Sequence, residues 1–279
     1  MKHFFLFALA FLFVVDLNAQ VAIAPFVVYI NPATRYGEYQ VINNNTYDTD
    51  VEITLKFAYP TTDSLGKVTF KWEDTTNVQW SKWDMSENIK AFPRRFVLKP
   101  NQQQKVKFLM RLPSEAPNGM YWTRIVTKSA PKLKAIDTTD DGKTARASLL
   151  IITQYTNLIV YQKGKVETNV SVEGTEYYQD STYINLLLKL HQWGEFPAWC
   201  NIHFKILEES GAEFFSFDDV AAVYNDAVKK VRIEKKKLKP GQKYTIEYDV
   251  TSDRTDIPKE MHTLFPPFKG KTEFIYRAD

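Results

Sequence analysis

Short runs of alternating apolar and polar residues recur along the whole chain, and they constrain its fold more than any other feature. A period of two is typical of a β-strand that buries one face, whereas an amphipathic helix needs an apolar stripe with a period of 3.6 residues. Almost no segment carries a helical stripe longer than two turns. Aromatic residues make up 14% of the chain and Pro outnumbers Gly by 13 to 10, which also favours strands and turns. The sequence therefore predicts an all-β protein.

Residues 1–19 have the pattern of an export signal. One basic residue, Lys2, precedes an apolar run at 4–15, and Leu17-Asn18-Ala19 follows as an imperfect cleavage site. The run is shorter than the roughly 20 residues that span a bilayer, so a cleaved signal is favoured over a permanent anchor. No cysteine follows the run, which excludes lipid attachment there. We expect a periplasmic protein with no stable membrane span.

The chain after the signal divides into two sets of predicted strands, which indicates two immunoglobulin-like β-sandwich domains in tandem. The first domain is predicted at residues 20–162, with strands at 22–30, 38–42, 50–59, 95–99, 104–112, 121–128 and 145–161. The second is predicted at 163–279, with strands at 166–172, 183–190, 200–208, 220–224, 231–235, 243–250 and 271–276. Lys239-Pro240-Gly241-Gln242 is predicted to be a turn that leads into one of these strands.

A tryptophan-rich insertion at residues 68–92 allows two structures, an extended hairpin or a short helix. Trp72, Trp80 and Trp83 lie in it. Tryptophan presents a large apolar area at low entropic cost, so these rings can stack on sugars or anchor a protein partner. The alternative is that they seal one end of the first domain.

The chemistry-bearing residues show no pattern of a catalytic or cofactor site. The chain contains neither a G-x-S-x-G elbow nor a G-x-x-x-x-G-K-[ST] phosphate loop, and no carboxylate pair is marked as catalytic. Cys200 is the only cysteine, so no internal disulfide can form. Cys200 and His203 are an odd number of residues apart on a predicted strand and so point to opposite faces. We expect no catalytic residue, no metal and no cofactor.

The charge pattern argues against nucleic acid as a partner, because the net charge is only +3 and no basic footprint stands out. A basic run from Lys229 to Lys239 is interleaved with apolar residues. It predicts either one solvated strand face with its turn, or a surface for an acidic partner or for membrane headgroups.

The predicted strand at 147–161, ASLLIITQYTNLIVY, is the most informative segment. Four consecutive aliphatic residues place apolar side chains on both faces of a strand, which a sheet with one buried face does not need. They are Leu149, Leu150, Ile151 and Ile152. We expect one face to fill the core and the other to be covered by the second domain or by a strand added from another chain. The polar segment before it, 129–144, predicts a long hairpin loop.

Several segments of the first domain resemble the periplasmic chaperones of pilus assembly. They are the opening strand AIAPFVVYI, the strand end VINN, the run FPRRFVLKPNQQQKVKFLMRLP, the strand start NGMYWTRI and the aliphatic strand end NLIVYQKG. In that family the last strand of the first domain lends alternate aliphatic side chains to a subunit that lacks a strand. The resemblance implies that role for Leu150 and Ile152, or for Leu149 and Ile151 if the register differs by one.

The same family anchors the C-terminal carboxylate of its subunit with an Arg and a Lys, and here the sequence departs from the family. The matching positions fall at or near Phe26 and Asn157, and the nearest cations in sequence are Arg35 and Lys163.

Together these features predict a periplasmic chaperone-like protein that binds exported protein subunits by strand donation and works with an outer-membrane assembly protein. The predicted partner-binding residues are Phe26, Leu149, Leu150, Ile151, Ile152, Gln154 and Asn157. Two alternatives stay open: a structural scaffold subunit of an envelope or secretion complex, and a carbohydrate-binding or hydrolytic module that uses the tryptophans.

Overall fold

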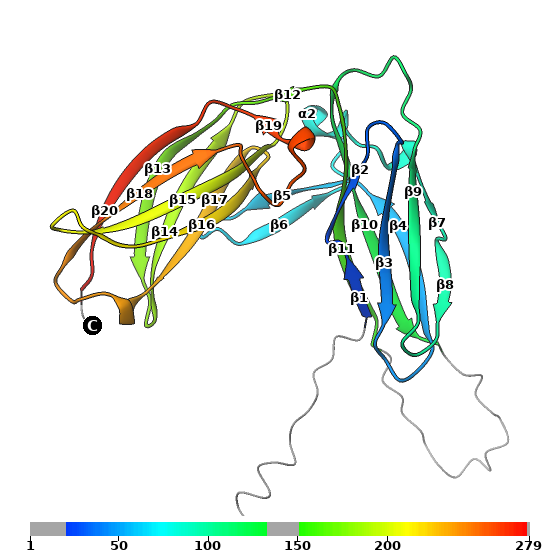
Figure 1. The fold of residues 1–279 in the computed structure, drawn as a ribbon, viewed down its shortest axis with the longest axis horizontal. Helices are drawn as coiled ribbons and strands as arrows, with labels where there is room; N and C mark the ends of the chain where they lie inside the picture. Colours follow the sequence, from blue (N-terminus) through cyan, green and yellow to red (C-terminus); the bar gives the residue numbers. More distant parts are fainter. Residues whose placement is uncertain (1–20, 133–150, 278–279) are drawn as a thin grey trace, which may run out of the picture.

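The computed structural model describes residues 21–132 and 151–277, and strands make up most of both stretches. The predicted signal at 1–19 lies outside the described residues. The strands form two immunoglobulin-like sandwiches in tandem, built from β1–β11 and from β12–β20, and Figure 1 shows them meeting at an angle near β12. The predicted all-β fold class is confirmed. None of the helices in the described part of the chain is long and apolar enough to cross a membrane.

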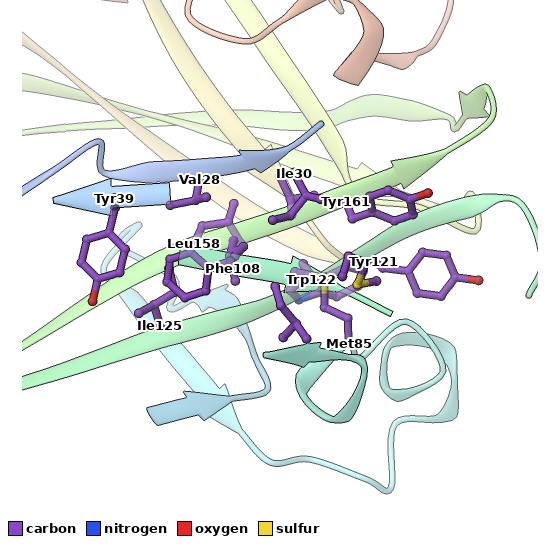
Figure 2. Close-up of a cluster of buried hydrophobic side chains, with 14 of the residues drawn as sticks. Val28, Ile30, Tyr39, Met85, Phe108, Tyr121, Trp122, Ile125, Leu158 and Tyr161 are labelled. Atoms are coloured by element: carbon purple, nitrogen blue, oxygen red, sulfur yellow. The ribbon is translucent and has the colours of Figure 1, made fainter. Parts of the chain in front are cut away.

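The first sandwich consists of a four-stranded and a five-stranded sheet packed face to face. The four-stranded sheet has the order β1 (Val21–Ala24), β3 (Tyr36–Asn43), β9 (Gln103–Met110) and β7 (Ile89–Phe92). The five-stranded sheet has the order β2 (Val27–Ile30), β11 (Thr153–Lys163), β10 (Gly119–Pro131), β4 (Thr49–Lys56) and β8 (Arg95–Leu98). Side chains such as Tyr39, Ile125 and Leu158 fill the space between the sheets (Figure 2).

The predicted strand at 22–30 is wrong in one respect, because the structure divides it between the two sheets. β1 pairs with β3, whereas β2 runs parallel to β11. Pro25 separates the two strands and has no N–H with which to continue a ladder. The opening segment therefore contributes an edge strand to each sheet.

The predicted strand at 145–161 also differs from the structure. β11 begins at Thr153, and residues 145–150 lie outside the described residues. β10 continues to Pro131, so the first residues of the predicted loop at 129–144 belong to a strand.

Both structures considered for the insertion at 68–92 occur, one after the other. β5 (Ala58–Thr62) and β6 (Val68–Trp72) form a hairpin, and α2 (Val78–Ser81) and a 3₁₀ turn (Ser86–Asn88) follow it. The hairpin reaches the second sandwich, where the backbone N–H of Val228 donates to Thr62 Oγ1 at 2.7 Å.

The second sandwich has a three-stranded sheet and a four-stranded sheet. The first has the order β13 (Val170–Gln179), β14 (Tyr183–Gln192) and β17 (Asp226–Glu234). The second has the order β16 (Glu213–Val223), β15 (Ala198–Glu208), β18 (Lys243–Thr251) and β20 (Phe268–Ile275). Two short strands, β12 (Val166–Glu167) and β19 (Thr263–Leu264), pair in parallel next to the joint. The predicted turn before β18 is present, with a bond from Gln242 N to Lys239 O of 3.3 Å.

The joint between the sandwiches is filled by aromatic side chains. Trp80 and Trp83 are 0% and 3% exposed. The ring of Trp80 lies 6.0 Å from that of Trp122 and 5.9 Å from that of Tyr224 in the second sandwich, and Trp83 lies 4.8 Å from Phe196. One continuous buried cluster therefore joins the two sandwiches. Trp80 and Trp83 seal the end of the first domain and present no open face to a sugar.

Candidate functional site

β11 differs along its length in how many neighbouring strands it has. β10 pairs with it from Thr153 to Lys163, whereas β2 pairs with the other edge only from Leu158 to Tyr161. We call residues 154–157 the open half of β11 and residues 158–161 the sealed half. Within the described ranges no strand pairs with the second edge of the open half. This edge is a site where a strand from another chain can add.

The burial of side chains changes one residue earlier, at Asn157, which is buried. In the sealed half, Ile159 and Val160 are both 0% exposed, so both faces of the strand are covered. In the open half Gln154 is exposed, and Tyr155 and Thr156 are half-buried. The structure therefore places two-sided burial in the NLIVY segment at the end of the predicted strand.

The aliphatic run lies directly before the open half. Ile151 and Ile152 are 48% and 59% exposed, and Leu149 and Leu150 lie outside the described residues. The expectation that one face of this run fills the core is wrong for Ile151 and Ile152. The physical reason is that Tyr155 packs against the core at this end and donates a hydrogen bond to Val21 O at 2.6 Å.

A groove of about 490 Å³ begins at Ile152 and crosses the outer face of the five-stranded sheet. Its lining combines apolar side chains with the ion pair between Arg95 and Glu52, whose Nη2 and Oε1 atoms are 2.5 Å apart. Ile152, Ala130 and Val97 contribute apolar side chains, whereas Val51 lies in the core below the groove and Phe96 packs against that core. Such a surface suits an extended polypeptide that contributes both apolar and polar side chains.

The structure brings Phe26 and Asn157 together, as the sequence match implied, but it gives them different roles. Phe26 is 71% exposed in the connection between β1 and β2, whereas Asn157 is only 1% exposed. Asn157 Nδ2 donates to the backbone oxygen of Phe26 at 3.0 Å. Asn157 therefore holds this connection against β11, at the boundary between the two halves, and its side chain does not face a partner.

Neither of the two cations nearest in sequence is available as a carboxylate anchor. Lys163 Nζ donates to the backbone oxygens of Ser114 and Ala116, both at 2.5 Å. Arg35 Nη1 donates to Leu112 O at 2.9 Å. Both cations therefore hold the loop that precedes β10.

Arg124 on β10 is a residue that the sequence analysis missed. Its side chain is buried, its Nε donates to Ala58 O at 3.4 Å, and its guanidinium lies 4.8 Å from the centre of the Phe70 ring. No carboxylate of the described residues lies within ion-pair distance of it. Burial lowers the pKa of this guanidinium, although arginine stays charged. The sequence did indicate that Arg124 is unusual, because this arginine lies inside YWTRIV, a strand segment with apolar residues on both faces.

The remaining charged and thiol groups engage locally. In the basic run, Lys229 pairs with Asp219 at 2.7 Å and Lys237 lies 5.4 Å from the Phe215 ring centre, which favours the interpretation as a solvated strand face. Cys200 is buried, and burial raises the pKa of its thiol to about 12. His203 lies on the opposite face of β15, as predicted, so these two residues share no site.

Comparison with known proteins yields structural similarity but no sequence match. No family model matches the chain, and no match was found among curated proteins. Among solved structures, the YadV chaperone is 10% identical, with 92% of this chain and 100% of that chain covered and a TM-score of 0.42. The E. coli chaperone DraB is 12% identical, with coverage of 90% and 95% and a TM-score of 0.42.

A third similar structure is a Salmonella enterica SafA pilin in complex with the SafB chaperone. It is 14% identical, with coverage of 91% and 96% and a TM-score of 0.41. The chain is thus similar to several solved chaperone structures. At these identities and TM-scores the similarity assigns no role to any residue, so a function for this chain has to rest on its own side chains.

Proposed function

We propose that this chain is a periplasmic chaperone-like protein that binds exported protein subunits by adding a strand at the open half of β11. The single observation that carries the proposal is an edge at residues 154–157 with no strand partner among residues 21–132 and 151–277, preceded by the exposed Ile151 and Ile152. An outer-membrane assembly protein is the second partner we propose. Residues 20–162 then form the domain that binds the subunit, and residues 163–279 form the second domain.

In this mode the affinity comes from main-chain hydrogen bonds and the register comes from alternate side chains. Gln154 pairs with Lys128 of β10, whose side chain is exposed on the outer face of the sheet. Because side chains alternate along an extended chain, Ile152 lies on the same face as Gln154, and Leu150 follows if the chain continues as a strand. Leu149 and Ile151 would occupy the other face. A shift of one residue exchanges the two sets.

Recovery of the subunit from the periplasm tests this proposal. The full chain with an affinity tag should recover an exported subunit in a near one-to-one amount. The double variant Leu150→Asp and Ile152→Asp should lose most of it, because two carboxylates would then have to be buried in the interface without partners. The matched control is Val220→Asp, at a residue that is 40% exposed on β16, the edge strand of a sheet in the second sandwich.

Two outcomes would contradict the proposal. One is equal recovery of the subunit by the double variant and by the unchanged chain. The other is fractionation of the chain with membrane complexes instead of release in soluble form, which would favour the scaffold alternative. Thermal unfolding of each variant verifies that a loss of partner is not a loss of fold.

A further inference from the structure

Three side chains with metal-ligating groups gather on the second sandwich, away from the β11 edge. Glu173, His191 and Asp226 come from β13, β14 and β17, which are neighbouring strands of one sheet. His191 Nδ1 lies 2.6 Å from Asp226 Oδ1 and 4.0 Å from Glu173 Oε1. One ligand atom of each residue lies within 4.8 Å of the other two. Three adjacent strands thus present one nitrogen and two oxygen ligands at a single place.

The backbone of this sheet explains why the three side chains meet. Asp226 is directly opposite His191 in the register of β14 and β17. The register of β13 with β14 shifts between Val172 and Gly174, so Glu173 is the extra residue of a bulge. A bulge changes the direction of the side chain that it carries. At this bulge the Glu173 carboxylate lies beside His191.

Trp193, which is not one of the three ligating residues, also orients the ring of His191. Trp193 stacks on it with ring centres 5.7 Å apart and an angle of 21° between the planes. Stacking restricts rotation of the imidazole while its Nδ1 atom faces the two carboxylates. A ligand whose orientation is already restricted loses less entropy when it binds an ion.

The distances fit a tetrahedral ion after small rotations. With metal–ligand bonds of about 2.0–2.1 Å, two ligand atoms of a tetrahedral site lie about 3.3 Å apart. The observed 2.6 Å and 4.0 Å lie on either side of that value. The Glu173 and Asp226 side chains are 60% and 83% exposed, so both can turn without disturbing the core. Water can occupy the fourth position.

We propose that Glu173, His191 and Asp226 form a binding site for a divalent transition-metal ion of the Zn²⁺ class. An imidazole nitrogen with two carboxylate oxygens suits Zn²⁺ and Co²⁺, whereas Mg²⁺ and Ca²⁺ are bound mainly through oxygen. Such an ion links three strands of the second sandwich close to the joint. The metal site is independent of strand addition at β11.

The chain provides a matched control for this site. His203 pairs with Asp218 at 2.9 Å on β15 and β16, and its imidazole is as exposed as that of His191, at 37% for both side chains. Within the described residues, the only group of three or more metal-ligating side chains at such distances is the one at His191. A pair of ligands without a third should bind an ion far more weakly.

Titration of the purified full chain with Co²⁺ and Zn²⁺ tests the proposal. Co²⁺ should produce visible absorption bands of a low-coordinate site, and Zn²⁺ should displace it in a one-to-one ratio. Glu173→Gln and Asp226→Asn should each weaken Zn²⁺ binding by at least about tenfold, and His191→Ala should abolish it. His203→Ala should leave binding unchanged.

Stability gives a second readout that does not use Co²⁺. Zn²⁺ should raise the midpoint of thermal unfolding of the unchanged chain and of His203→Ala, but not that of Glu173→Gln, because only a folded site binds the ion. Absence of Co²⁺ absorption at millimolar metal would overturn the proposal. So would an equal loss of Zn²⁺ affinity in His203→Ala, or an equal rise in the midpoint with Mg²⁺.

Discussion

The two halves of β11 are parts of one strand and share β10 as a neighbour, but they differ at the other edge. The sealed half has β10 on one edge and β2 on the other, and its side chains belong to the buried cluster that includes Ile257 and Met261 of the second sandwich. The open half has only β10 as a neighbouring strand among the described residues. The more hydrophobic half is therefore the one that no partner can reach. The edge that another chain can use begins where the pairing with β2 ends, and hydrophobicity alone does not locate it.

The largest loss of stability should come from a substitution in the aromatic joint between the two sandwiches, next to the sealed half of β11. Trp122 is fully buried, its ring lies 5.3 Å from that of Tyr224, and its Nε1 donates to Ala58 O at 3.2 Å. Trp122→Ala should lower the free energy of unfolding by about 3–5 kcal/mol, because it leaves a cavity and removes one of the two side-chain donors to Ala58 O, the other being Arg124 Nε. Urea unfolding measures this change. A loss below about 1 kcal/mol would mean that the joint contributes little to stability.

The same substitution placed on the two sides of the boundary compares them directly. Ile159 is 0% exposed in the sealed half, and Ile152 is 59% exposed before the open half. Ile159→Ala should cost about 2–5 kcal/mol, whereas Ile152→Ala should cost less than about 0.5 kcal/mol. Urea unfolding under identical conditions measures both values. Equal costs would show that the aliphatic run is buried in solution and would remove the basis for a donated strand.

Stability should depend less on Asn157, which lies at the boundary between the two halves of β11. Asn157→Ala removes the hydrogen bond to Phe26 O and also removes the buried Oδ1, which has no partner among the described residues. The net cost should be about 1 kcal/mol. Hydrogen exchange of Val27 and Val28 should become faster, because the segment before β2 loses a side-chain bond to β11 that supplements the strand pairing. Unchanged exchange at these two residues would mean that the strand pairing alone holds β2.

The smallest effect should come from Asp180, which is remote from both halves. Asn185 Nδ2 and the backbone N–H groups of Thr182 and Tyr183 donate to its carboxylate, and these bonds lower its pKa to about 2. Because the folded value is below the ordinary value, this stabilisation is present above pH of about 4 and is lost as the pH falls toward about 2. Asp180→Asn should flatten that dependence, as measured by urea midpoints across this range. Recovery of the exported subunit at neutral pH should not change.

Prediction from sequence succeeded where a local pattern decides the structure. The alternation in β18 buries Tyr244, Ile246, Tyr248 and Val250 as predicted, because a period of two places every second side chain on one face. Prediction failed where distant contacts decide. The opening strand enters two sheets, and Ile151 and Ile152 stay exposed, because the neighbouring strands and Tyr155 occupy the positions that these residues would need.

The candidate sites show the same division. The aliphatic run and the strand after it were found from the sequence, because their apolar character is local. Arg124 was missed because its burial depends on Ala58 and Phe70, far away in the chain. The grouping of Glu173, His191 and Asp226 depends on the register of three strands and on a bulge, and no spacing along the chain reveals it.

The sequence by itself determined the all-β class, the two sets of strands and the aliphatic segment that leads into β11. These features arise from side-chain alternation and turn residues, which act over a few residues. Only the tertiary structure decided that β2 covers just one half of β11, that Trp80 and Trp83 close the joint, and that Asn157 marks the boundary. These depend on which strands pair and in what register, and pairing is settled by burial and hydrogen bonds between residues that are far apart in the chain.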